Sequence, residues 1–545
     1  MAKMTGGRAV VESLIAHGVD TVFGVISIHT MDVYDSLRDL SDRIRFVGCR
    51  HESAAAYMAY GYAQVTGKPG VIVSSTGPGA GNAVGALGEA YAASVPIVHI
   101  TTDVAPALRN SRRGEIHEPN NQLEMFRSVT AWNTFVPEPG GISAAIFEAF
   151  DYLRTNRPRP VDVEIATTAL ADTDDCEVLG PRAGPLPEPD RSLIDRAARL
   201  LSEARSPVIL AGGGVVTAGG TDALLKVAER LGAALATTYG GKGAVSDEHP
   251  LAVGCARGGR VYGQNPIFKL LEESDCVLVV GSRLSYTITS AVAMKLPANL
   301  IHLDIDGDVF DKNYPAAVRL KGHLKPGLAA LDRALEGLGV TAKAGVRSRI
   351  PAVKKLVRES LEKAGPGAQR ATDALRAALP RDAIISVDAT IPAYWMVRGL
   401  PVFGPRQYVS PHAWSSIGMA FPAGIGAKVG KPDRPVVAIH GDGGFQFNLQ
   451  ELGTCAQYQI PLTVIVFNDR SWGILKLNQK NLRGEKYFAT DLQNPDFVAL
   501  AAAYGIKGRR VDRLNDLAEE LADSTRKQDM RLIEVAIPDG FENLR

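Results

Sequence analysis

The sequence predicts an α/β protein built from three doubly wound parallel-sheet domains. Three observations lead to this fold. The chain has 545 residues, more than one core usually supports, and a prior of roughly 150 residues per domain suggests three or four domains. Short β-branched runs alternate with stretches of helical apolar spacing along most of the chain. Many of the 55 glycines come directly after such runs, where a strand would turn into a helix.

Two breaks in this alternation set the predicted domain boundaries. The runs TVFGV, RFVGCR, GVIVSS and PIVHITT belong to the first domain, and the proline-rich stretch LGPRAGPLPEP that follows is predicted to be a linker. The second domain begins at SPVILAGGG and includes LIHLDID, and the glycine-rich, basic stretch LEGLGVTAKAGVRSRIP ends it. The third carries DAIISVD, RPVVAIHG, PLTVIVFND and RLIEVAIP. The predicted domains are residues 1–180, 190–340 and 355–545.

Composition excludes several classes of partner. The 60 basic and 59 acidic side chains nearly cancel, so no global field favours nucleic acid or an anionic membrane. The apolar stretches fall well short of the ~20 residues that span a bilayer, and the N-terminus lacks the apolar core of a signal peptide, so a cytoplasmic protein is expected. The five cysteines lie far apart without a CxxC pair, which argues against a disulfide framework or a zinc site.

The most informative segment runs from Arg434 to Gly473. Its ends, residues 435–440 and 461–467, are apolar and strand-like, and the part between them has helical spacing. A crossover this short makes the two strands parallel neighbours that end at the same edge of the sheet. Asp442 follows the first strand and Asp469 follows the second. The two carboxylates are therefore expected to meet where ligands bind in open α/β sheets.

Two neighbouring carboxylates repel each other unless a cation lies between them. Hard oxygen ligands with room for phosphate oxygens suit Mg²⁺, which prefers an octahedron at about 2.0–2.1 Å. Gly441, Gly443 and Gly444 let the backbone approach a diphosphate closely, and a helix expected from about Phe445 offers unpaired amides. The alternative is a glycine turn followed by an unrelated surface turn, which the matched second strand ending in NDRSWG disfavours.

These residues resemble the thiamine diphosphate enzymes of the acetolactate synthase, pyruvate decarboxylase and acyl-CoA lyase group, whose signature is GDG followed one crossover later by an Asn/Asp pair. The resemblance covers essentially the whole chain. It implies thiamine diphosphate and Mg²⁺ as cofactors, with Asp442 and Asp469 as side-chain ligands of the metal and Ser471 as a backbone ligand. Asn468 is the alternative to Asp469. The cofactor-binding residues that the resemblance implies are Glu52, Thr76, Gly77, Pro78, Asn82, Ala389, Thr390, His412, Trp414, Ile417, Gly441, Asp442, Gly443, Gly444, Ser471, Trp472 and Gly473.

A second segment, residues 50–84, resembles the pyrimidine-binding part of the same family. On this match Glu52 hydrogen-bonds the aminopyrimidine, because a protonated ring nitrogen converts the 4′-amino group into the base that deprotonates carbon 2 of the thiazolium. TGPGAGN, residues 76–82, is predicted to be a tight loop near the cofactor. In VSPHAWSSIGMAF, Ile417 matches the apolar wedge that bends the cofactor. Since relatives build the site from the first unit of one chain and the third of another, a homodimer or homotetramer is implied.

Further resemblances concern the reaction. FGVISIHTMD resembles a loop of oxalyl-CoA decarboxylases and 2-hydroxyacyl-CoA lyases, which would place His29 at the thiazolium. GSRLSY resembles the CoA lyases more than the flavin-containing acetolactate synthases, so FAD is not expected, and AGGGVV, residues 211–216, suits a phosphate of ADP or CoA in the central domain. His117 and Glu118 are both candidates near the substrate, and Gln493 is a polar residue that could reach it. The candidate catalytic residues are Glu52, His29, His117, Glu118 and Gln493.

The leading hypothesis is a carbon–carbon lyase that cleaves a 2-hydroxyacyl-CoA to a ketone or aldehyde and formyl-CoA. The alternative is an acetolactate synthase-type carboligase or a 2-oxoacid decarboxylase acting on pyruvate-like substrates. Simple decarboxylation to an aldehyde is disfavoured because apolar residues, Ile474 and Leu475, stand where pyruvate decarboxylases carry a glutamate. A catalytically silent thiamine-binding subunit is disfavoured because Glu52 and both metal carboxylates are present.

Overall fold

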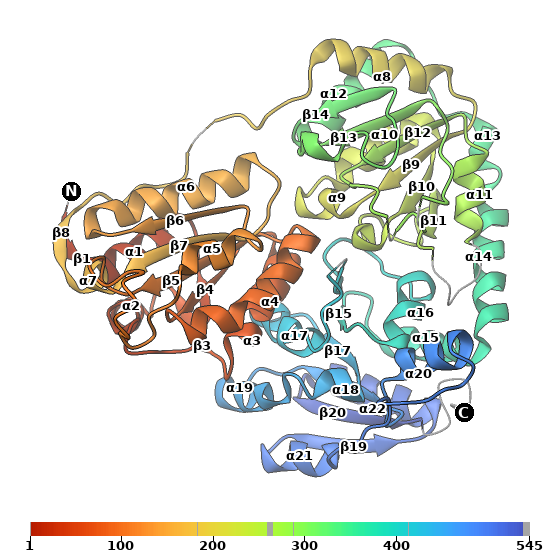
Figure 1. The fold of residues 1–545 in the computed structure, drawn as a ribbon. Coiled ribbons are helices and arrows are strands. Elements are labelled where there is room, and N and C mark those ends of the chain that lie inside the picture. The colour runs from red at the N-terminus through yellow and green to blue at the C-terminus, as the bar shows by residue number, and fades with distance from the viewer. Residues whose placement is uncertain are drawn as a thin grey trace.

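The computed structural model describes residues 2–182, 184–258, 265–286, 288–290, 292–412 and 414–537. These residues form three six-stranded sheets in which every strand pair is parallel, and helices pack on the faces of each sheet (Figure 1). The predicted fold class is therefore confirmed. The sheets belong to an N-terminal domain, red to orange in Figure 1, a central domain in yellow and green, and a C-terminal domain in blue. The residue limits of the three domains stay predictions.

The N-terminal sheet owes its parallel strands to short runs that are buried on both faces. Val71, Ile72 and Val73, for example, are almost completely buried, as expected for a β-branched run covered by helices. In spatial order the strands are β3 (Arg45–Gly48), β2 (Thr21–Gly24), β4 (Gly70–Ser74), β5 (Ile97–Asp103), β7 (Val161–Ala166) and β6 (Trp132–Val136). The helices are α1 (Gly6–Ala16), α2 (Met31–Asp39), α3 (Glu52–Thr66), α4 (Pro78–Ala93), α5 (Gln122–Arg127), α6 (Ile142–Thr155) and α7 (Thr167–Ala171). β1 (Ala2–Thr5) and β8 (Thr173–Cys176) form a separate antiparallel pair.

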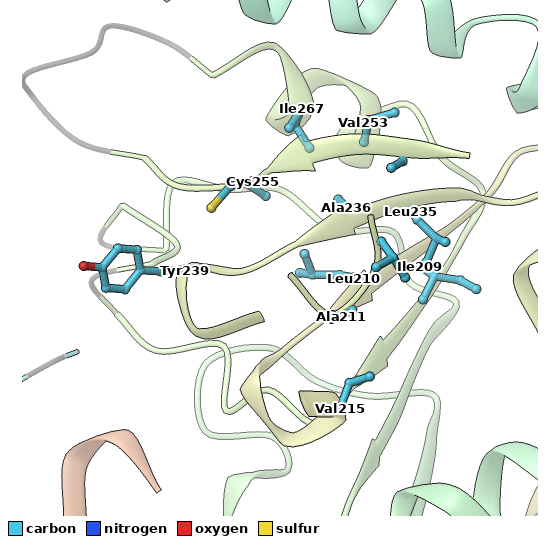
Figure 2. Packing of buried hydrophobic residues seen from close by; sticks show 14 of the residues in the cluster. Ile209, Leu210, Ala211, Val215, Leu235, Ala236, Tyr239, Val253, Cys255 and Ile267 are labelled. Atoms are coloured by element: carbon cyan, nitrogen blue, oxygen red, sulfur yellow. The ribbon is translucent and has the colours of Figure 1, made fainter. Parts of the chain in front are cut away.

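The central domain repeats this construction. Figure 2 shows Ile209 and Leu210 beside Leu235 and Ala236, which are register partners on neighbouring strands. In spatial order the strands are β11 (Ala252–Cys255), β10 (Ala234–Thr237), β9 (Pro207–Ala211), β12 (Cys276–Val280), β13 (Leu300–Asp304) and β14 (Val318–Lys321). The helices are α8 (Arg191–Glu203), α9 (Gly213–Thr217), α10 (Thr221–Leu231), α11 (Pro266–Glu272) and α12 (Leu324–Gly337). Glycines that come just after β9 and β12, namely Gly213, Gly214 and Gly281, line a cavity that residues of the N-terminal domain also line.

The C-terminal sheet brings the predicted metal residues to one edge. In spatial order its strands are β16 (Tyr408–Val409), β15 (Ile384–Val387), β17 (Val436–Gly441), β18 (Thr463–Asn468), β20 (Arg531–Ala536) and β19 (Lys507–Val511). The helices from the central domain onward are α13 (Ala344–Arg347), α14 (Ile350–Ala364), α15 (Pro366–Ala378), α16 (Ile391–Gly399), α17 (Ala420–Gly430), α18 (Asp442–Phe445), α19 (Leu452–Tyr458), α20 (Gly473–Leu482), α21 (Phe497–Ala503) and α22 (Leu514–Lys527).

Two local predictions differ from the structure. The helix expected from about Phe445 begins at Asp442, and its first turn, α18, is separated from α19 by a 3₁₀ turn at Leu449–Glu451. The segment TGPGAGN is a loop only up to Gly77, because α4 begins at Pro78. A proline at the first helical position has no amide to leave unpaired and already has a helical φ, so this residue starts the helix well.

Helices α3 and α17 join the N-terminal and C-terminal domains within one chain. Their backbones approach closely at two glycines: a β-carbon on Gly61 would overlap the carbonyl of Ala423, and one on Gly426 would overlap the carbonyl of Met58. Small residues at both sides of a crossing allow this approach. The contact orients the N-terminal domain relative to the edge of the C-terminal sheet.

All five cysteines are buried and free of disulfides. Within the part of the chain that the structure describes, the helices lack the combination of length and apolar character that crossing a membrane requires.

Candidate active site

Asp442 and Asp469 meet at the edge of the C-terminal sheet. β17 and β18 are parallel neighbours, and each aspartate comes directly after its strand. Both line a cavity of about 1000 Å³. Burial raises the pKa of Asp442 to about 6, an amide hydrogen bond from Asn494 opposes this, and the charge of Asp469 adds to it. Burial likewise raises the pKa of Asp469. Two acids that disfavour each other's charge fit a site that holds a cation.

The two carboxylates suit a metal ion that is also coordinated by oxygens of a bound diphosphate. Among the described residues no group of three or more His, Cys, Asp and Glu side chains could hold a metal ion. Two carboxylates therefore need backbone and phosphate oxygens to complete an octahedron. Ser471 lines the same cavity, and its amide donates to Asp469 Oδ1 at 3.0 Å, which fixes the turn after β18. The residues present thus fit a magnesium–diphosphate pair.

Between the two alternatives at the end of β18, the geometry favours Asp469. The side-chain amide of Asn468 donates to Glu534 at 2.8 Å, and its carbonyl oxygen accepts from Asn494 at 2.9 Å. Both polar atoms of the Asn468 side chain are thus used in hydrogen bonds to Glu534 and Asn494, whereas Asp469 lines the cavity.

Asn494 is a functional candidate that sequence reasoning missed. Its amide donates to Asp442 Oδ2 at 2.7 Å as well as to Asn468, and its carbonyl accepts from Gln446 at 2.9 Å. It therefore joins the loops that follow β17 and β18. Its neighbour Gln493, the predicted candidate, is exposed. The sequence could not distinguish Asn494 from the adjacent Gln493, because the residues that Asn494 contacts, Asp442 and Asn468, lie far away in the chain.

The cavity gathers most of the residues predicted for the cofactor. Gly443 and Gly444 are needed at their positions, because a β-carbon would run into the Trp472 ring and into Asp388 respectively. His412 lies elsewhere, against a second cavity, and Trp414 is about half exposed. We call this cavity the cofactor cavity, after the ligand that the sequence predicts for it. The predicted residues that line it are Ala389, Thr390, Ile417, Gly441, Asp442, Gly443, Gly444, Asp469, Ser471, Trp472 and Gly473.

Glu52 lies in the N-terminal domain, as the first residue of α3. It is half-buried, and the amide of Asn82 on α4 donates to its Oε2 at 2.9 Å. The turn before α4 is held by the buried side chain of Gln122, which accepts from the Gly77 amide at 2.9 Å and lies 3.3 Å from the Thr76 hydroxyl. Gln122 was also missed, since it reaches this turn from another helix. Pro78 then starts α4.

Two histidines lie near this glutamate. The rings of His29 and His117 have centroids 4.8 Å apart, and their Nδ1 atoms are 3.4 and 3.5 Å from the hydroxyl of Ser75. Burial, followed by repulsion from His117, lowers the pKa of His29. Glu118 points differently: its carboxylate accepts the amides of Arg112 and Gly114 and closes a loop. Of the two candidates His117 and Glu118, it is His117 that lies next to His29.

Asp442 and Asp469 lie apart from Glu52 within one chain. Every residue that lines the cofactor cavity lies at position 364 or later. The N-terminal domain, which carries Glu52 and the histidine pair, contributes no wall to that cavity among the described residues.

A second cavity, of about 550 Å³, lies between the N-terminal and central domains. Gly213 and Gly214 at the start of α9 line it together with Arg157 and Arg283. Burial, together with repulsion from Arg157 and Arg159, lowers the pKa of Arg283 to about 10. Crowded guanidinium groups beside strand-end glycines suit a phosphate-bearing ligand.

Comparison with known proteins agrees with this geometry. Three family models match: the thiamine pyrophosphate enzyme N-terminal TPP binding domain over residues 4–125, the central domain over 194–331 and the C-terminal TPP binding domain over 388–535. The chain is 34% identical to a probable 2-ketoarginine decarboxylase of Pseudomonas aeruginosa over 98% of this chain and 94% of that protein. It is 32% identical to a probable acetolactate synthase large subunit of Methanocaldococcus jannaschii, over 98% and 92% of the two chains. It is 31% identical to a sulfoacetaldehyde acetyltransferase of Castellaniella defragrans, over 95% and 90%. The chain belongs to the thiamine diphosphate-dependent enzyme family, in its acetolactate synthase and decarboxylase group.

Proposed function

We propose that this enzyme acts on a 2-oxo acid, from which it releases CO₂ before passing the remaining acyl unit to a second carbonyl or to a proton. The pair His29 and His117, in the same domain as Glu52, carries the proposal, because it places two imidazoles that can donate or accept a hydrogen bond where a substrate carbonyl oxygen would lie. The names of the relatives, a 2-ketoarginine decarboxylase and acetolactate synthases, support a 2-oxo acid as the substrate class.

The cofactor-binding residues have distinct tasks in this proposal. Thiamine diphosphate, when bound, supplies a carbon nucleophile that also accepts the electron pair of the bond that breaks. Asp442, Asp469 and the Ser471 carbonyl would hold Mg²⁺ against the diphosphate. Ile417 would press on the cofactor from the wall of its cavity, and the Glu52 carboxyl would hold the proton of the pyrimidine nitrogen.

The histidine pair would handle the proton at the substrate oxygen. The lowered pKa of His29 keeps its imidazole neutral at pH 7, so it can donate or accept a hydrogen bond there. Ile474 and Leu475 line the cofactor cavity, and neither side chain can deliver a proton to carbon. This apolar wall supports transfer to a second carbonyl over release of a free aldehyde.

We propose a homodimer as the minimal active unit. Glu52 lies outside the cavity that holds Asp442 and Asp469, so a second copy of the chain has to bring it there. Exposed apolar side chains accompany both half-sites, as expected for surfaces that become covered. The exposed residues next to the two histidines along the chain are Ile26, Ile28, Met31 and Ile116, and the exposed residues that line the cofactor cavity are Leu475, Leu482 and Tyr487.

A 2-hydroxyacyl-CoA lyase is the second candidate. The observation that favours it is the cavity with Arg157 and Arg283, which suits the phosphates of ADP or CoA. In that reaction the histidine pair would take the hydroxyl proton as the carbon–carbon bond breaks. No relative named above is a lyase of this kind, so we rank it second.

Substrate trials separate the two candidates. Purified enzyme with thiamine diphosphate and Mg²⁺ is incubated with pyruvate, 2-oxobutyrate or 2-ketoarginine, and separately with short 2-hydroxyacyl-CoA thioesters. We expect CO₂ from at least one 2-oxo acid and none with Glu52→Gln. Acetolactate from pyruvate would identify a carboligase, and an aldehyde without ligation product a decarboxylase. Formyl-CoA from a thioester, without CO₂ from any 2-oxo acid, would overturn the first proposal in favour of the second.

A further inference from the structure

A buried glutamate of the N-terminal domain accepts hydrogen bonds from the backbone next to Ile417, the residue that matches the apolar wedge of the family. Glu89, on α4, is completely buried. Its carboxylate accepts the amide of His412 at 2.6 Å and the amide of Ser416 at 2.9 Å. His412 and residues 414–419 are here called the wedge segment, because Ile417 is part of it. A charged side chain of the N-terminal domain therefore holds a backbone segment of the C-terminal domain, and this segment borders the cofactor cavity.

A second buried carboxylate holds the other end of the wedge segment. Asp388, directly after β15, accepts the amides of Gly418 at 2.9 Å and Met419 at 3.2 Å. Ile417 thus lies between two anchored stretches. Ser415 and Gly418 have positive φ values of 61° and 84°, a conformation that a free chain rarely keeps at a serine. The anchors hold the backbone in this shape.

The anchoring by Glu89 depends on its having two acceptor oxygens. Burial raises the pKa of Glu89, while the amides of Ser416 and His412 lower it by hydrogen bonding to the charged form. A glutamine at this position would keep one acceptor and turn an NH₂ group towards an amide donor. One of the two backbone bonds would be lost, although the size of the side chain would hardly change.

The wedge segment borders both cavities. His412 lines the cavity with the arginines, whereas Ser415 and Ile417 line the cofactor cavity. Between them the Trp414 ring packs on Gly88, the residue before Glu89, where a β-carbon would come within 2.8 Å of the ring. Helix α4 therefore contacts the segment through two consecutive residues.

We propose that Glu89 is a positioning residue for thiamine diphosphate: its two amide hydrogen bonds fix the wedge segment, so that Ile417 meets the cofactor ring in the reactive geometry. The proposal rests on the proposed binding of the cofactor in the cavity of Asp442 and Asp469. Glu89 does not touch the reacting atoms, and it acts through the backbone.

The first test uses the cofactor-free protein. Hydrogen–deuterium exchange of peptides that cover the wedge segment is compared in the unmodified protein, Glu89→Gln and Glu164→Gln. Glu164 is a matched control, since it is also a completely buried glutamate of the N-terminal domain, but it pairs with Arg109. We expect at least one of the amides of His412 and Ser416 to exchange about tenfold faster or more in Glu89→Gln only. Unchanged exchange would overturn the proposal.

The second test adds the cofactor. At saturating thiamine diphosphate and Mg²⁺, exchange of the carbon 2 proton of the bound cofactor is followed by NMR after acid quenching. We expect Glu89→Gln to slow this exchange about tenfold or more while the melting temperature matches that of Glu164→Gln, because a misplaced ring costs rate more than binding. Exchange within twofold of the unmodified protein would contradict the positioning role.

Two further outcomes are decisive. If Glu89→Gln does not fold, Glu89→Asp takes its place, since it keeps the charge but is too short to reach both amides, and slowed carbon 2 exchange is expected there as well. If the unmodified protein does not take up the cofactor at all, the proposed function fails, and the exchange of the wedge segment still reports whether Glu89 anchors it.

Discussion

At the scale of single residues, Asn494 joins the loops that follow β17 and β18 through its bonds to Asp442 and Asn468. We predict that Asn494→Ala weakens Mg²⁺-dependent uptake of thiamine diphosphate about tenfold, because the Asp442 carboxylate loses a charge-assisted hydrogen bond worth about 1.5–3 kcal/mol. Calorimetric titration of cofactor at fixed Mg²⁺ measures this. Asn133→Ala is the control, since its side-chain amide also donates a hydrogen bond, in this case to the Leu123 carbonyl of the N-terminal domain. Equal affinities of the two variants would contradict the role of Asn494.

His99 provides a test of pH dependence. It is completely buried, with Nδ1 2.8 Å from Asp162 and Nε2 2.7 Å from the Ser74 hydroxyl. Burial lowers the pKa of His99 to about 3, so its imidazole is neutral at pH 7, and burial raises the pKa of Asp162. Below pH 6.5 the unfolded chain binds a proton at this histidine that the folded protein rejects until about pH 3. The stability that a neutral His99 contributes is therefore present above pH 6.5 and is lost as the pH falls.

We accordingly predict that the stability advantage of the unmodified protein over His99→Gln shrinks by about 1.4 kcal/mol for each pH unit between pH 6 and pH 4. Urea unfolding at pH 7, 6, 5 and 4 measures it. His249→Gln, which changes a partly exposed histidine, should show no comparable trend. A pH-independent difference for His99→Gln would mean that the imidazole is already charged in the folded protein.

The site residues that the sequence predicts and those that it does not predict differ in one respect. The unpredicted ones have hydrogen-bond partners that lie far away along the chain. Asp442 and Asp469 could be brought to one cavity because each follows a recognisable strand of a single short crossover. Asn494 and Gln122 hydrogen-bond to partners 52 and 45 positions away, and Glu89 to a partner 323 positions away. No local spacing encodes such contacts, so these polar residues could not be distinguished from ordinary surface ones.

At the scale of elements, the crossing of α3 and α17 depends on the absence of side chains at Gly61 and Gly426. We predict that Gly61→Ala lowers the free energy of unfolding by about 3 kcal/mol or more, because the β-carbon overlaps the backbone of the other helix and forces the two apart. Gly337→Ala serves as the control. It lies at the end of α12 with open space around its β-carbon, so it should be neutral or stabilise by up to about 1 kcal/mol. Denaturant unfolding compares the two, and a neutral Gly61→Ala would show that the crossing can relax.

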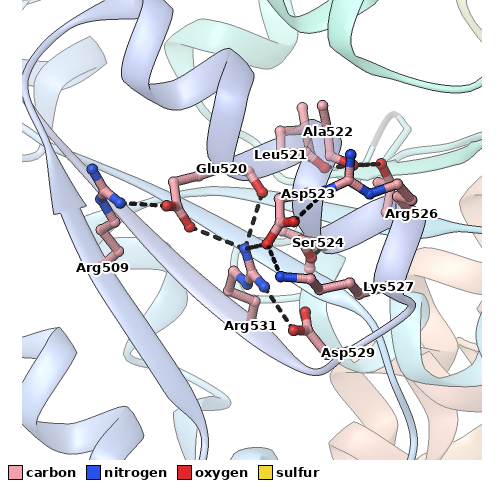
Figure 3. A network of polar contacts seen from close by, with 12 residues as sticks. Arg509, Glu520, Leu521, Ala522, Asp523, Ser524, Arg526, Lys527, Asp529 and Arg531 are labelled. Atoms are coloured by element: carbon pink, nitrogen blue, oxygen red, sulfur yellow. Dashed lines mark hydrogen bonds and ion pairs between the residues drawn. The ribbon is translucent and has the colours of Figure 1, made fainter.

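The strand β20 starts with a fully buried arginine. Arg531 pairs with Glu520 and Asp523, both at 3.0 Å, and with Asp529 at 2.6 Å (Figure 3). We predict that Arg531→Met destabilises the protein by about 3–5 kcal/mol, because three carboxylates lose their common counter-charge. Arg526→Met, which removes an exposed partner of Asp523, should cost less than about 1 kcal/mol. Urea unfolding at pH 7 measures both, and similar losses would show that Arg531 acts as a surface residue does.

The elements were predictable to different degrees for physical reasons. Strands buried on both faces are continuous apolar runs, so β4, β9 and β18 are recognisable in the sequence. The starts of α4 and α18 differ from the prediction because glycine-rich stretches are typical of loops, whereas both helices begin inside such a stretch. In α4 the helix begins at Pro78, since a proline already has a helical φ and lacks an amide that would be left unpaired.

At the scale of the whole molecule, α4 connects two different cofactor sites in the proposed dimer. Near its start Asn82 bonds Glu52, which would serve the cofactor held by the partner. Two turns later Glu89 bonds the wedge segment, which borders the cofactor held by its own chain. A helix fixed at both points would keep the two sites in a constant relation, and this arrangement follows only if the dimer exchanges Glu52 between chains.

Mixing two inactive variants tests that exchange directly. Glu52→Gln lacks the activating acid and Asp442→Asn lacks a metal ligand, so each homodimer should show no accelerated exchange of the cofactor's carbon 2 proton. In a mixed dimer one site combines the intact Asp442 of the first chain with the intact Glu52 of the second. With random pairing half of the dimers are mixed, and each has one complete site of two, so about a quarter of the unmodified exchange rate should return.

The mixture is made by unfolding and refolding the two variants together, and the exchange of carbon 2 is read by NMR, which needs no substrate. The control refolds each variant alone at the same total concentration, and sedimentation shows whether dimers have formed. If Glu52 instead served the cofactor of its own chain, every site in a mixed dimer would still carry one defect. No rate would return, and the N-terminal domain would then have to swing towards its own cavity, which the tight crossing of α3 and α17 at Gly61 and Gly426 opposes.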